Sequence, residues 1–324
     1  MGLQSKDILG MQQLSAAEIQ DILHTAINMK KVLTSGNKRT AHLQGKTVIT
    51  LFYENSTRTR VSFELAGKYL GAQVANISSS SSSVAKRESL YDTVMTLNAM
   101  AADMIVLRHS VAGAPHFLAQ HMDASIINAG DGMDEHPTQA LLDMLTIIEH
   151  KGDLAGLKVA VVGDLAHSRV VRSNIYGLCK LGAKVHVFAP ATLTPPGLTE
   201  SGAILCQSME EALTDADVVM GLRLQLERQA KGLFPSVNEY SQFYGLNETN
   251  IQWARPDAMV MHPGPMNRGV EITGGLADSP QSAIQEQVTS GMAVRMAILY
   301  LLNIYRNRNN LGFGIPVAAF GEEF

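Results

Sequence analysis

Two arginines and three hydroxyl side chains crowd residues 55–60, Asn-Ser-Thr-Arg-Thr-Arg, directly after an apolar run. Ser56 is a good N-cap for a helix that begins here. The N–H groups in the first turn of a helix have no partner within it, and the helix dipole adds partial positive charge. Arg58 and the hydroxyl groups around it therefore predict an anion site that is best matched to phosphate. Its members are Ser56, Thr57, Arg58 and Thr59.

The same pattern also fits a capped surface helix whose arginines meet water or carboxylates. A nucleotide-binding Walker loop is excluded, because the pattern G-x-x-x-x-G-K is absent. Arg60 lies two positions after Arg58 and so points to a different part of the helix surface. We expect Arg60 to form a structural ion pair.

Other cationic side chains also follow apolar, β-rich runs. They are Arg108, His136, Arg169, Arg223 and His262. In open parallel sheets, ligands bind beyond the carboxyl ends of the strands. Any one of these residues alone is also consistent with a surface arginine or a structural histidine, and a lone histidine is more often structural than catalytic. Their shared place at strand ends favours a binding site.

Strands must alternate with helices to place these residues. The β-rich runs are 46–53, 103–108, 124–129, 157–164, 183–190, 216–223 and 257–264, and helical patterns occur at 58–70, 88–100, 137–149 and 170–181. This alternation predicts parallel sheets that are covered by helices on both faces. We predict an α/β fold of two doubly wound parallel-sheet domains with the active site in the cleft between them.

The length of 324 residues suits two domains of ordinary size. Turn residues at 149–158 place the boundary, which gives domains of residues 1–150 and 151–281. A final helical stretch, about 282–306, is expected to pack back on the first domain. We assign no function to the C-terminal segment 307–324.

Composition limits the class of function. Apolar residues make up 46% and charged residues 17%, and the net charge is −4, so no global field attracts nucleic acid. There is no run of eighteen apolar residues and no signal peptide, so we expect no membrane span. Two cysteines, Cys179 and Cys206, give neither a disulfide framework nor zinc spacing. A cytoplasmic protein without a metal is the natural interpretation.

A nicotinamide-dependent dehydrogenase is a rival, because Gly163 follows an apolar run as in a dinucleotide-binding loop. The full pattern G-x-G-x-x-G is absent, however. The next predicted strand, 183–190, ends in Phe-Ala-Pro and lacks the acidic residue that would hold a ribose. We therefore set the dehydrogenase aside.

Five spaced segments resemble motifs of the transcarbamoylase family. They are S-T-R-T-R at 56–60, V-L-R-H at 106–109, H-P-T-Q-A-L-L-D at 136–143 and, in the second half, L-R-L-Q-L-E-R at 222–228 with H-P-G-P-M-N-R-G-V-E-I at 262–272. The second-half motifs resemble the branch of the family that uses aspartate. The ornithine branch carries His-Cys-Leu-Pro, whereas Pro263 follows His262 here.

The resemblance implies roles for residues of the first domain. Ser56, Thr57, Arg58 and Thr59 would bind the phosphate of carbamoyl phosphate. Arg108 would contact both the phosphate and the carbonyl oxygen, His136 would donate to that oxygen beside Thr59, and Gln139 would accept from the carbamoyl amine.

In the second domain, the resemblance assigns Arg169 and Arg223 to the two carboxylates of aspartate, with Gln225 assisting. An ornithine site would need acidic or neutral groups instead, so the charge of these arginines argues against ornithine. The turn at 262–265 can hold a cis peptide. The backbone carbonyls of Pro263 and Gly264 would contact the attacking amine.

A loop of the neighbouring subunit completes the site in this family. Counting back from 88–93 assigns its two substrate contacts to Lys86 and Ser82, with Arg87 in place of the usual glycine. By composition alone, the serine run 78–83 would be a mobile linker. The resemblance thus implies an obligatory homotrimer with shared sites. It leaves open whether regulatory or dihydroorotase chains accompany it.

The implied reaction is carbamoyl transfer from carbamoyl phosphate to the amine of L-aspartate, an early step of pyrimidine synthesis. No cofactor or metal is expected, because the leaving group is already activated. Two alternatives remain: a carbamoyltransferase for another amino acid, and a non-catalytic paralogue in a larger assembly.

Overall fold

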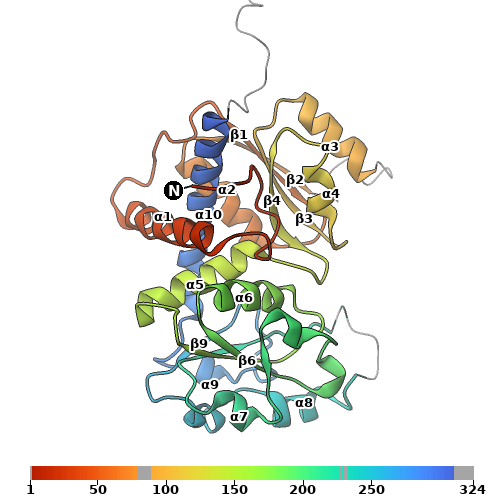
Figure 1. Ribbon diagram of the computed structural model, residues 1–324, viewed down its shortest axis with the longest axis vertical. Helices are drawn as coiled ribbons and strands as arrows, with labels where there is room; N and C mark the ends of the chain where they lie inside the picture. Colours follow the sequence, from red (N-terminus) through yellow and green to blue (C-terminus); the bar gives the residue numbers. More distant parts are fainter. Residues whose placement is uncertain (1, 79–88, 227, 229–232, 310–324) are drawn as a thin grey trace, which may run out of the picture.

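The computed structural model describes residues 2–78, 89–226, 228 and 233–309. Two lobes are stacked along the long axis of the molecule, each built around one sheet (Figure 1). The first lobe holds strands β1 to β4 and the second holds β5 to β9.

Both sheets are parallel throughout. The first has the order β2-β1-β3-β4, with β1 Thr47–Phe52, β2 Gln73–Ser78, β3 Met104–His109 and β4 Ser125–Asp131. The second has the order β7-β6-β5-β8-β9, with β5 Lys158–Val162, β6 Lys184–Phe188, β7 Ile204–Leu205, β8 Val218–Gly221 and β9 Met259–Met261. The predicted fold class is confirmed, although β2 and β7 were not predicted.

In each sheet, the order in which strands are added changes from one side to the other at one point. In the first sheet β1 lies between β2 and β3, and in the second β5 lies between β6 and β8. The connections that leave the two neighbouring strands diverge there, which opens a crevice beyond the carboxyl ends. The switch points are therefore β1/β3 and β5/β8. Arg108 lies near the end of β3, and three other predicted arginines, Arg58, Arg169 and Arg223, follow β1, β5 and β8.

Helices cover both faces of each sheet. The α-helices are α1 Ala16–Thr34, α2 Thr57–Tyr69, α3 Leu90–Ala99, α4 Ala114–Ala119, α5 Pro137–Lys151, α6 Arg169–Lys180, α7 Met209–Leu213, α8 Val237–Tyr244, α9 Gly274–Ala277 and α10 Ile284–Arg308. Short 3₁₀ turns occupy Ala191–Leu193, Leu198–Ser201 and Asn250–Trp253. One apolar core packs α3 and α4 on a face of the first sheet, and another packs α7 on a face of the second. The opposite faces share a single core.

Helices α5 and α6 pack against each other between the two lobes (Figure 1). Their apolar side chains belong to the core that both sheets share, so they hold the lobes together. Helix α10 follows the second sheet but packs against α1, α2 and α5. It is long and apolar enough to cross a membrane by length and composition, but 67% of its most apolar window is buried inside the molecule, as for a core helix.

Candidate active site

The turn that joins β1 to α2 carries the predicted anion site. Ser56 occupies the N-cap position of α2, as predicted, but its hydroxyl accepts no hydrogen bond from the helix, so the expected capping contact is wrong. The first bond within the helix runs from Arg60 N to Ser56 O. The N–H groups of Thr57, Arg58 and Thr59 precede that bond and have no partner within the helix. Three N–H groups, a free Ser56 hydroxyl and a helix dipole therefore converge on one turn.

Arg60 does not form the expected ion pair with any residue that the structure describes. It is half-buried, and its charge contributes to lowering the pKa of Glu64 four residues along α2, where the hydrogen bond from Lys68 is the main cause. Ser82 and Lys86 fall outside the described residues.

Arg108 lies in β3, beside β1 at the switch point of the first sheet. Its side chain is mostly buried, and its Nη1 donates to the carbonyl of Ala129, 3.4 Å away. Burial, foremost, and the charges of Arg169, Arg228 and Arg58 together lower the pKa of Arg108 to about 9, while the charge of Glu54 opposes them. The neighbouring arginines repel this guanidinium, so an anion that binds beside it stabilises its charged form.

Arg169 is the first residue of α6, directly beyond β5, and only 5% of it is exposed. Its guanidinium reaches into the first lobe, where Nη1 donates to the carbonyl of Gly132 at 3.3 Å. Gly130, at a φ of 113°, lies against this guanidinium, and a β-carbon there would come within 2.9 Å of it. The glycine thus makes room for an arginine that crosses between the lobes.

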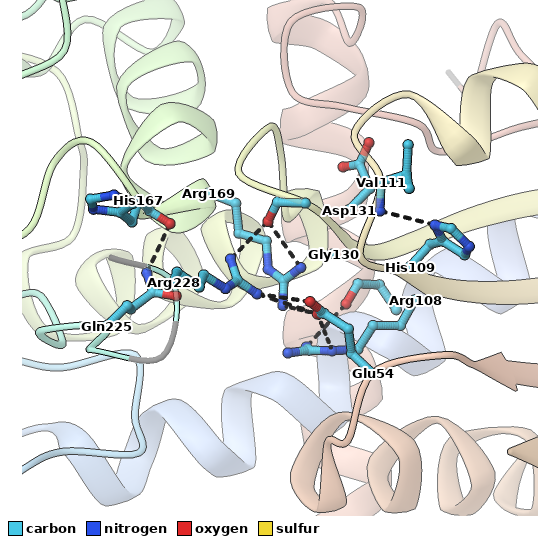
Figure 2. A network of polar contacts seen from close by, with 12 residues as sticks. Glu54, Arg108, His109, Val111, Gly130, Asp131, His167, Arg169, Gln225 and Arg228 are labelled. Atoms are coloured by element: carbon cyan, nitrogen blue, oxygen red, sulfur yellow. Dashed lines mark hydrogen bonds and ion pairs between the residues drawn. The ribbon is translucent and has the colours of Figure 1, made fainter. Parts of the chain in front are cut away.

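Glu54 forms ion pairs with arginines of both lobes (Figure 2). Its carboxylate accepts from Arg169 Nη2 at 2.8 Å and from Arg228 Nη2 at 3.1 Å, and it pairs with Arg108 Nε at 3.4 Å. Burial raises the pKa of Glu54, but the three arginines, Arg169 foremost, outweigh it and hold the pKa below its usual value. Glu54 is therefore an ionised link across the cleft.

Arg223 follows β8 at the other side of the second switch point. Burial lowers the pKa of Arg58, and the nearby charge of Arg223 lowers it further, so the two guanidiniums face one cleft. Gln225, two residues on, donates its side-chain amide to the carbonyl of His167 at 2.9 Å (Figure 2). Its side chain is thereby held near the end of the loop that leads into α6.

The loop after β9 closes the cleft from the second lobe. The Gly264–Pro265 peptide is cis, as the sequence allows. Gly264 has a φ of 61°, and a β-carbon there would lie 2.5 Å from Nη1 of Arg58. Pro263 and Gly264 thus lie beside the turn at 55–60 of the opposite lobe, and their contact with an attacking amine stays a prediction.

His136 is the N-cap residue of α5, and only 4% of it is exposed. Its backbone N–H donates to Ser173 Oγ on α6 at 2.8 Å, and Pro137 begins the helix. Burial, with the charges of Arg108, Arg169 and Arg295, holds the pKa of His136 well below its ordinary value. The imidazole is therefore neutral at physiological pH, and a neutral ring donates through one nitrogen only.

Gln139 lies one turn further along α5 and is also buried. Its Nε2 donates to Asp143 Oδ1 at 2.9 Å. The donor end of the amide is thus engaged inside the protein, which leaves Oε1 as the acceptor end.

Sequence reasoning missed three charged members of the cleft: Glu54, Arg228 and Arg295. Glu54 lies just before the motif at 56–60, and Arg228 ends the motif at 222–228. Arg295 is buried on α10, where the charge of Arg58 helps to lower its pKa to about 10, burial being the main cause. Nothing in the spacing of α10 marks Arg295 as part of a site.

Two other features lie outside the cleft chemistry. His116, Asp131 and Asp134 bring ligand atoms within 4.8 Å of one another, but Asp131 already accepts from Gly113 N at 2.7 Å. A cavity of about 540 Å³ beside β6 and β7 is lined by residues that include Phe188 and Cys206. In the described part of the chain its lining has no charged side chain, so it lacks the cations that an anionic substrate needs.

Two sequence profiles of one family account for most of the chain. The profile described as the carbamoyl-P binding domain of aspartate/ornithine carbamoyltransferase matches residues 6–149. The profile described as the Asp/Orn binding domain matches residues 155–302. The chain belongs to the aspartate/ornithine carbamoyltransferase family.

Relatives within this family favour the aspartate branch. The aspartate carbamoyltransferase catalytic subunit of Ruminiclostridium cellulolyticum is 61% identical over 302 residues, which cover 93% of this chain and 96% of that protein. The subunit of the same name from Acetivibrio thermocellus is 63% identical, over 93% of this chain and 97% of its own.

Solved structures confirm the fold but do not separate the two branches. Aspartate transcarbamoylase from Trypanosoma cruzi, in complex with N-(phosphonacetyl)-L-aspartic acid, has a TM-score of 0.82 at 33% identity, over 92% of this chain and 96% of that one. Ornithine carbamoyltransferase from Pyrococcus furiosus also has a TM-score of 0.82, at 32% identity over 93% of this chain and 98% of its own. The choice between the two branches therefore rests on the high-identity relatives and on the residues of the cleft.

Proposed function

We propose that this protein transfers the carbamoyl group of carbamoyl phosphate to the amine of L-aspartate. The products are N-carbamoyl-L-aspartate and phosphate, and the reaction serves pyrimidine synthesis. One observation carries the proposal: the arginines of the two switch points meet in one cleft, because Glu54 pairs with both Arg108 and Arg169. Arg58 of the first lobe lies against Gly264 of the second, and the charge of Arg223 lowers the pKa of Arg58. Such a cleft suits two anionic reactants that are held face to face.

Charge selects the second substrate. Arg169 and Arg223 each present a guanidinium, the group best shaped to hold a carboxylate by paired hydrogen bonds. L-Aspartate has two carboxylates, whereas the far end of ornithine is cationic and would meet like charge. The high identity to catalytic subunits named for aspartate supports the same choice.

The chemistry follows from the placement of donors. The aspartate amine attacks the carbonyl carbon, a C–N bond forms, and the carbonyl oxygen gains negative charge. Thr59, Arg108 and His136 donate to that oxygen as its charge develops. The C–O bond to phosphate then breaks, and phosphate leaves into the turn at residues 56–59, while the amine proton passes to it.

A protein base is not needed for this proton. Glu54 is the carboxylate that the structure places in the cleft, but three arginines hold its pKa below the usual value, against the effect of burial. A carboxylate of lowered pKa is a poor acceptor at neutral pH. Departing phosphate is more basic and is already at the reacting carbon.

The assembly is part of the proposal. We propose a homotrimer in which Ser82 and Lys86 of each chain reach the neighbouring site. Exposed apolar side chains on α3 and α4 support an interface beside this segment; among them, Tyr91 is 42% exposed and Phe117 is 46% exposed. We further propose a cytoplasmic location, and regulatory or dihydroorotase chains remain possible companions.

The test is an acceptor screen with the purified protein. Carbamoyl phosphate is supplied with L-aspartate, L-ornithine or other amino acids, and the ureido product and phosphate are both measured. We expect product with aspartate alone and a trimer mass by light scattering. Turnover with another amino acid would favour the first alternative, and no turnover with any amine would favour a non-catalytic paralogue.

A further inference from the structure

Asp143 is fully buried on α5, and three side-chain amides from three helices donate to it. Its Oδ1 accepts from Gln139 Nε2 at 2.9 Å and from Gln287 Nε2 at 2.7 Å. Its Oδ2 accepts from Asn174 Nδ2 at 2.8 Å. The three donors come from α5, α10 and α6, so one carboxylate joins helices of both lobes.

An ionised carboxylate only accepts hydrogen bonds, so each amide must turn its NH₂ end toward Asp143. Asn174 shows how strongly this requirement acts. Its NH₂ group faces Asp143, and its Oδ1 is buried without a hydrogen-bond partner among the described residues. The same NH₂ group also donates to the carbonyl of Val170 at 3.2 Å, so the carboxylate and this carbonyl together hold the orientation although an oxygen is left unsatisfied.

Two of these amides lead to the substrates. Gln139 donates to Asp143 through Nε2, which leaves Oε1 as the acceptor that the proposed reaction assigns to the carbamoyl amine. Gln287 directs its Oε1 to the backbone N–H of His262, which it accepts at 3.0 Å. His262 in turn accepts from Gly264 N through Nδ1 at 2.9 Å, which fixes the loop that contacts the attacking amine.

We propose that Asp143 is a positioning residue that orients both hydrogen-bond acceptors of the reaction. It sets Gln139 Oε1 for the carbamoyl amine, and through Gln287 and His262 it sets the Pro263–Gly264 carbonyls for the amine of aspartate. This inference rests on the proposed carbamoyl transfer and assigns an acceptor geometry within it. Asp143 touches neither substrate.

A purely structural role does not explain a carboxylate at this place. Burial raises the pKa of Asp143 to about 6, against the three amide donors and the charge of Arg295 on α10, which all lower it. The ionised form at neutral pH is therefore a cost to stability. An amide or a neutral group would be cheaper to bury, but only the carboxylate turns all three amides the same way.

The first test is Asp143→Asn, which keeps the shape but offers one acceptor and one donor. Its NH₂ group must face at least one of the three amides, and a rotated Gln139 would present NH₂ to the carbamoyl amine. We expect kcat/KM for carbamoyl phosphate to fall about tenfold to a hundredfold. Wild-type kinetics from this variant would overturn the inference.

A second variant separates orientation from general damage. In Asp143→Asn with Gln139→Glu, the new carboxylate accepts from Asn at position 143 and still offers an oxygen to the carbamoyl amine. The number of charges is unchanged, because the carboxylate has moved by one helical turn. We expect this double variant to be several-fold more active than Asp143→Asn alone. Activity at or below that of the single variant would contradict the orientation mechanism.

The Gln287 branch has its own readout, which also serves if Asp143→Asn does not fold. Gln287→Leu breaks the link to His262 and keeps the bond between Asp143 and Gln139. We expect KM for aspartate to rise about tenfold with KM for carbamoyl phosphate unchanged. An unchanged KM for aspartate would overturn this branch.

The matched control is Asn174→Ala, which removes the one amide that leads to neither substrate. We expect its thermal stability to fall while its kcat stays within about twofold of wild type. If Asn174→Ala loses as much catalysis as Asp143→Asn, the role of Asp143 is structural. Wild-type protein that makes no carbamoyl aspartate would refute the proposed function instead, so the two failures are distinguishable.

Discussion

Replacing His136 by alanine removes one donor to the carbonyl oxygen and leaves its surroundings in place. The backbone N–H of residue 136 keeps its bond to Ser173 Oγ at 2.8 Å, and Pro137 still begins α5. The variant should therefore fold and assemble as wild type does. A lost donor to a developing oxyanion costs about 10²–10³ in kcat, or about 2.7–4 kcal/mol of transition-state stabilisation.

The charge state of His136 sharpens this prediction. Burial and the charges of Arg108, Arg169 and Arg295 hold its pKa well below 6.5, so the ring donates as a neutral group. The ratio of wild-type to variant kcat should then be the same at pH 6.5 and pH 8.5. A donor that acts as a cation would instead give a ratio that rises as the pH falls.

The assay is steady-state formation of carbamoyl aspartate, at saturating substrates, across that pH range. Light scattering and thermal unfolding of the same samples exclude a loss of assembly or of fold. Wild-type turnover in His136→Ala would remove His136 from the mechanism. A ratio that grows as the pH falls from 8.5 to 6.5 would refute the neutral-donor account while keeping His136 in the site.

Three further predictions address binding and stability. Arg58→Ala should lose more activity than His136→Ala, because an unpaired phosphate dianion remains in a partly buried site; normal binding of carbamoyl phosphate by calorimetry would show that the phosphate lies elsewhere. Arg223→Ala should raise KM for aspartate by at least tenfold with carbamoyl phosphate binding unchanged, and the reverse pattern would reassign this arginine. Because burial raises the pKa of Asp143 from 3.8 to about 6, its stabilising proton is fully bound below pH 4 and lost as the pH rises through 6. Wild type should thus lose about 2 kcal/mol relative to Asp143→Asn between pH 4 and pH 7, measured by urea unfolding, and a constant difference would contradict the shift.

The sequence predicted the strand ends well, because a buried parallel strand is a short apolar run and the first polar residue after the run marks its end. Arg108, Arg169 and Arg223 were found in this way, and the structure places each at or beyond the end of a switch-point strand. Strand β2 was missed because Gln73–Ser78 mixes polar and apolar residues at the edge of the sheet. Helix α1 had a readable signal, the capping box of Ser15 and Glu18, that was not used.

The interior of the site could not be derived from spacing. The hydroxyl of Ser56 was expected to cap α2, but the choice between a helix N–H and a ligand depends on side-chain rotation. Asp143 lies within a quoted motif, yet its role depends on Gln287, which is 144 residues away in the sequence. Such contacts arise only when α5 and α10 pack together, so the local sequence pattern of either helix does not predict them.

The central claim is that phosphate and aspartate carboxylates occupy opposite walls of one cleft. A crystal structure with N-(phosphonacetyl)-L-aspartate, which joins both groups in one molecule, tests it most directly. We predict the phosphonate in the turn at 56–59, against Arg58, and the two carboxylates against Arg169 and Arg223. An analogue that contacts the arginines of one lobe only, with those of the other lobe turned to solvent, would contradict the account.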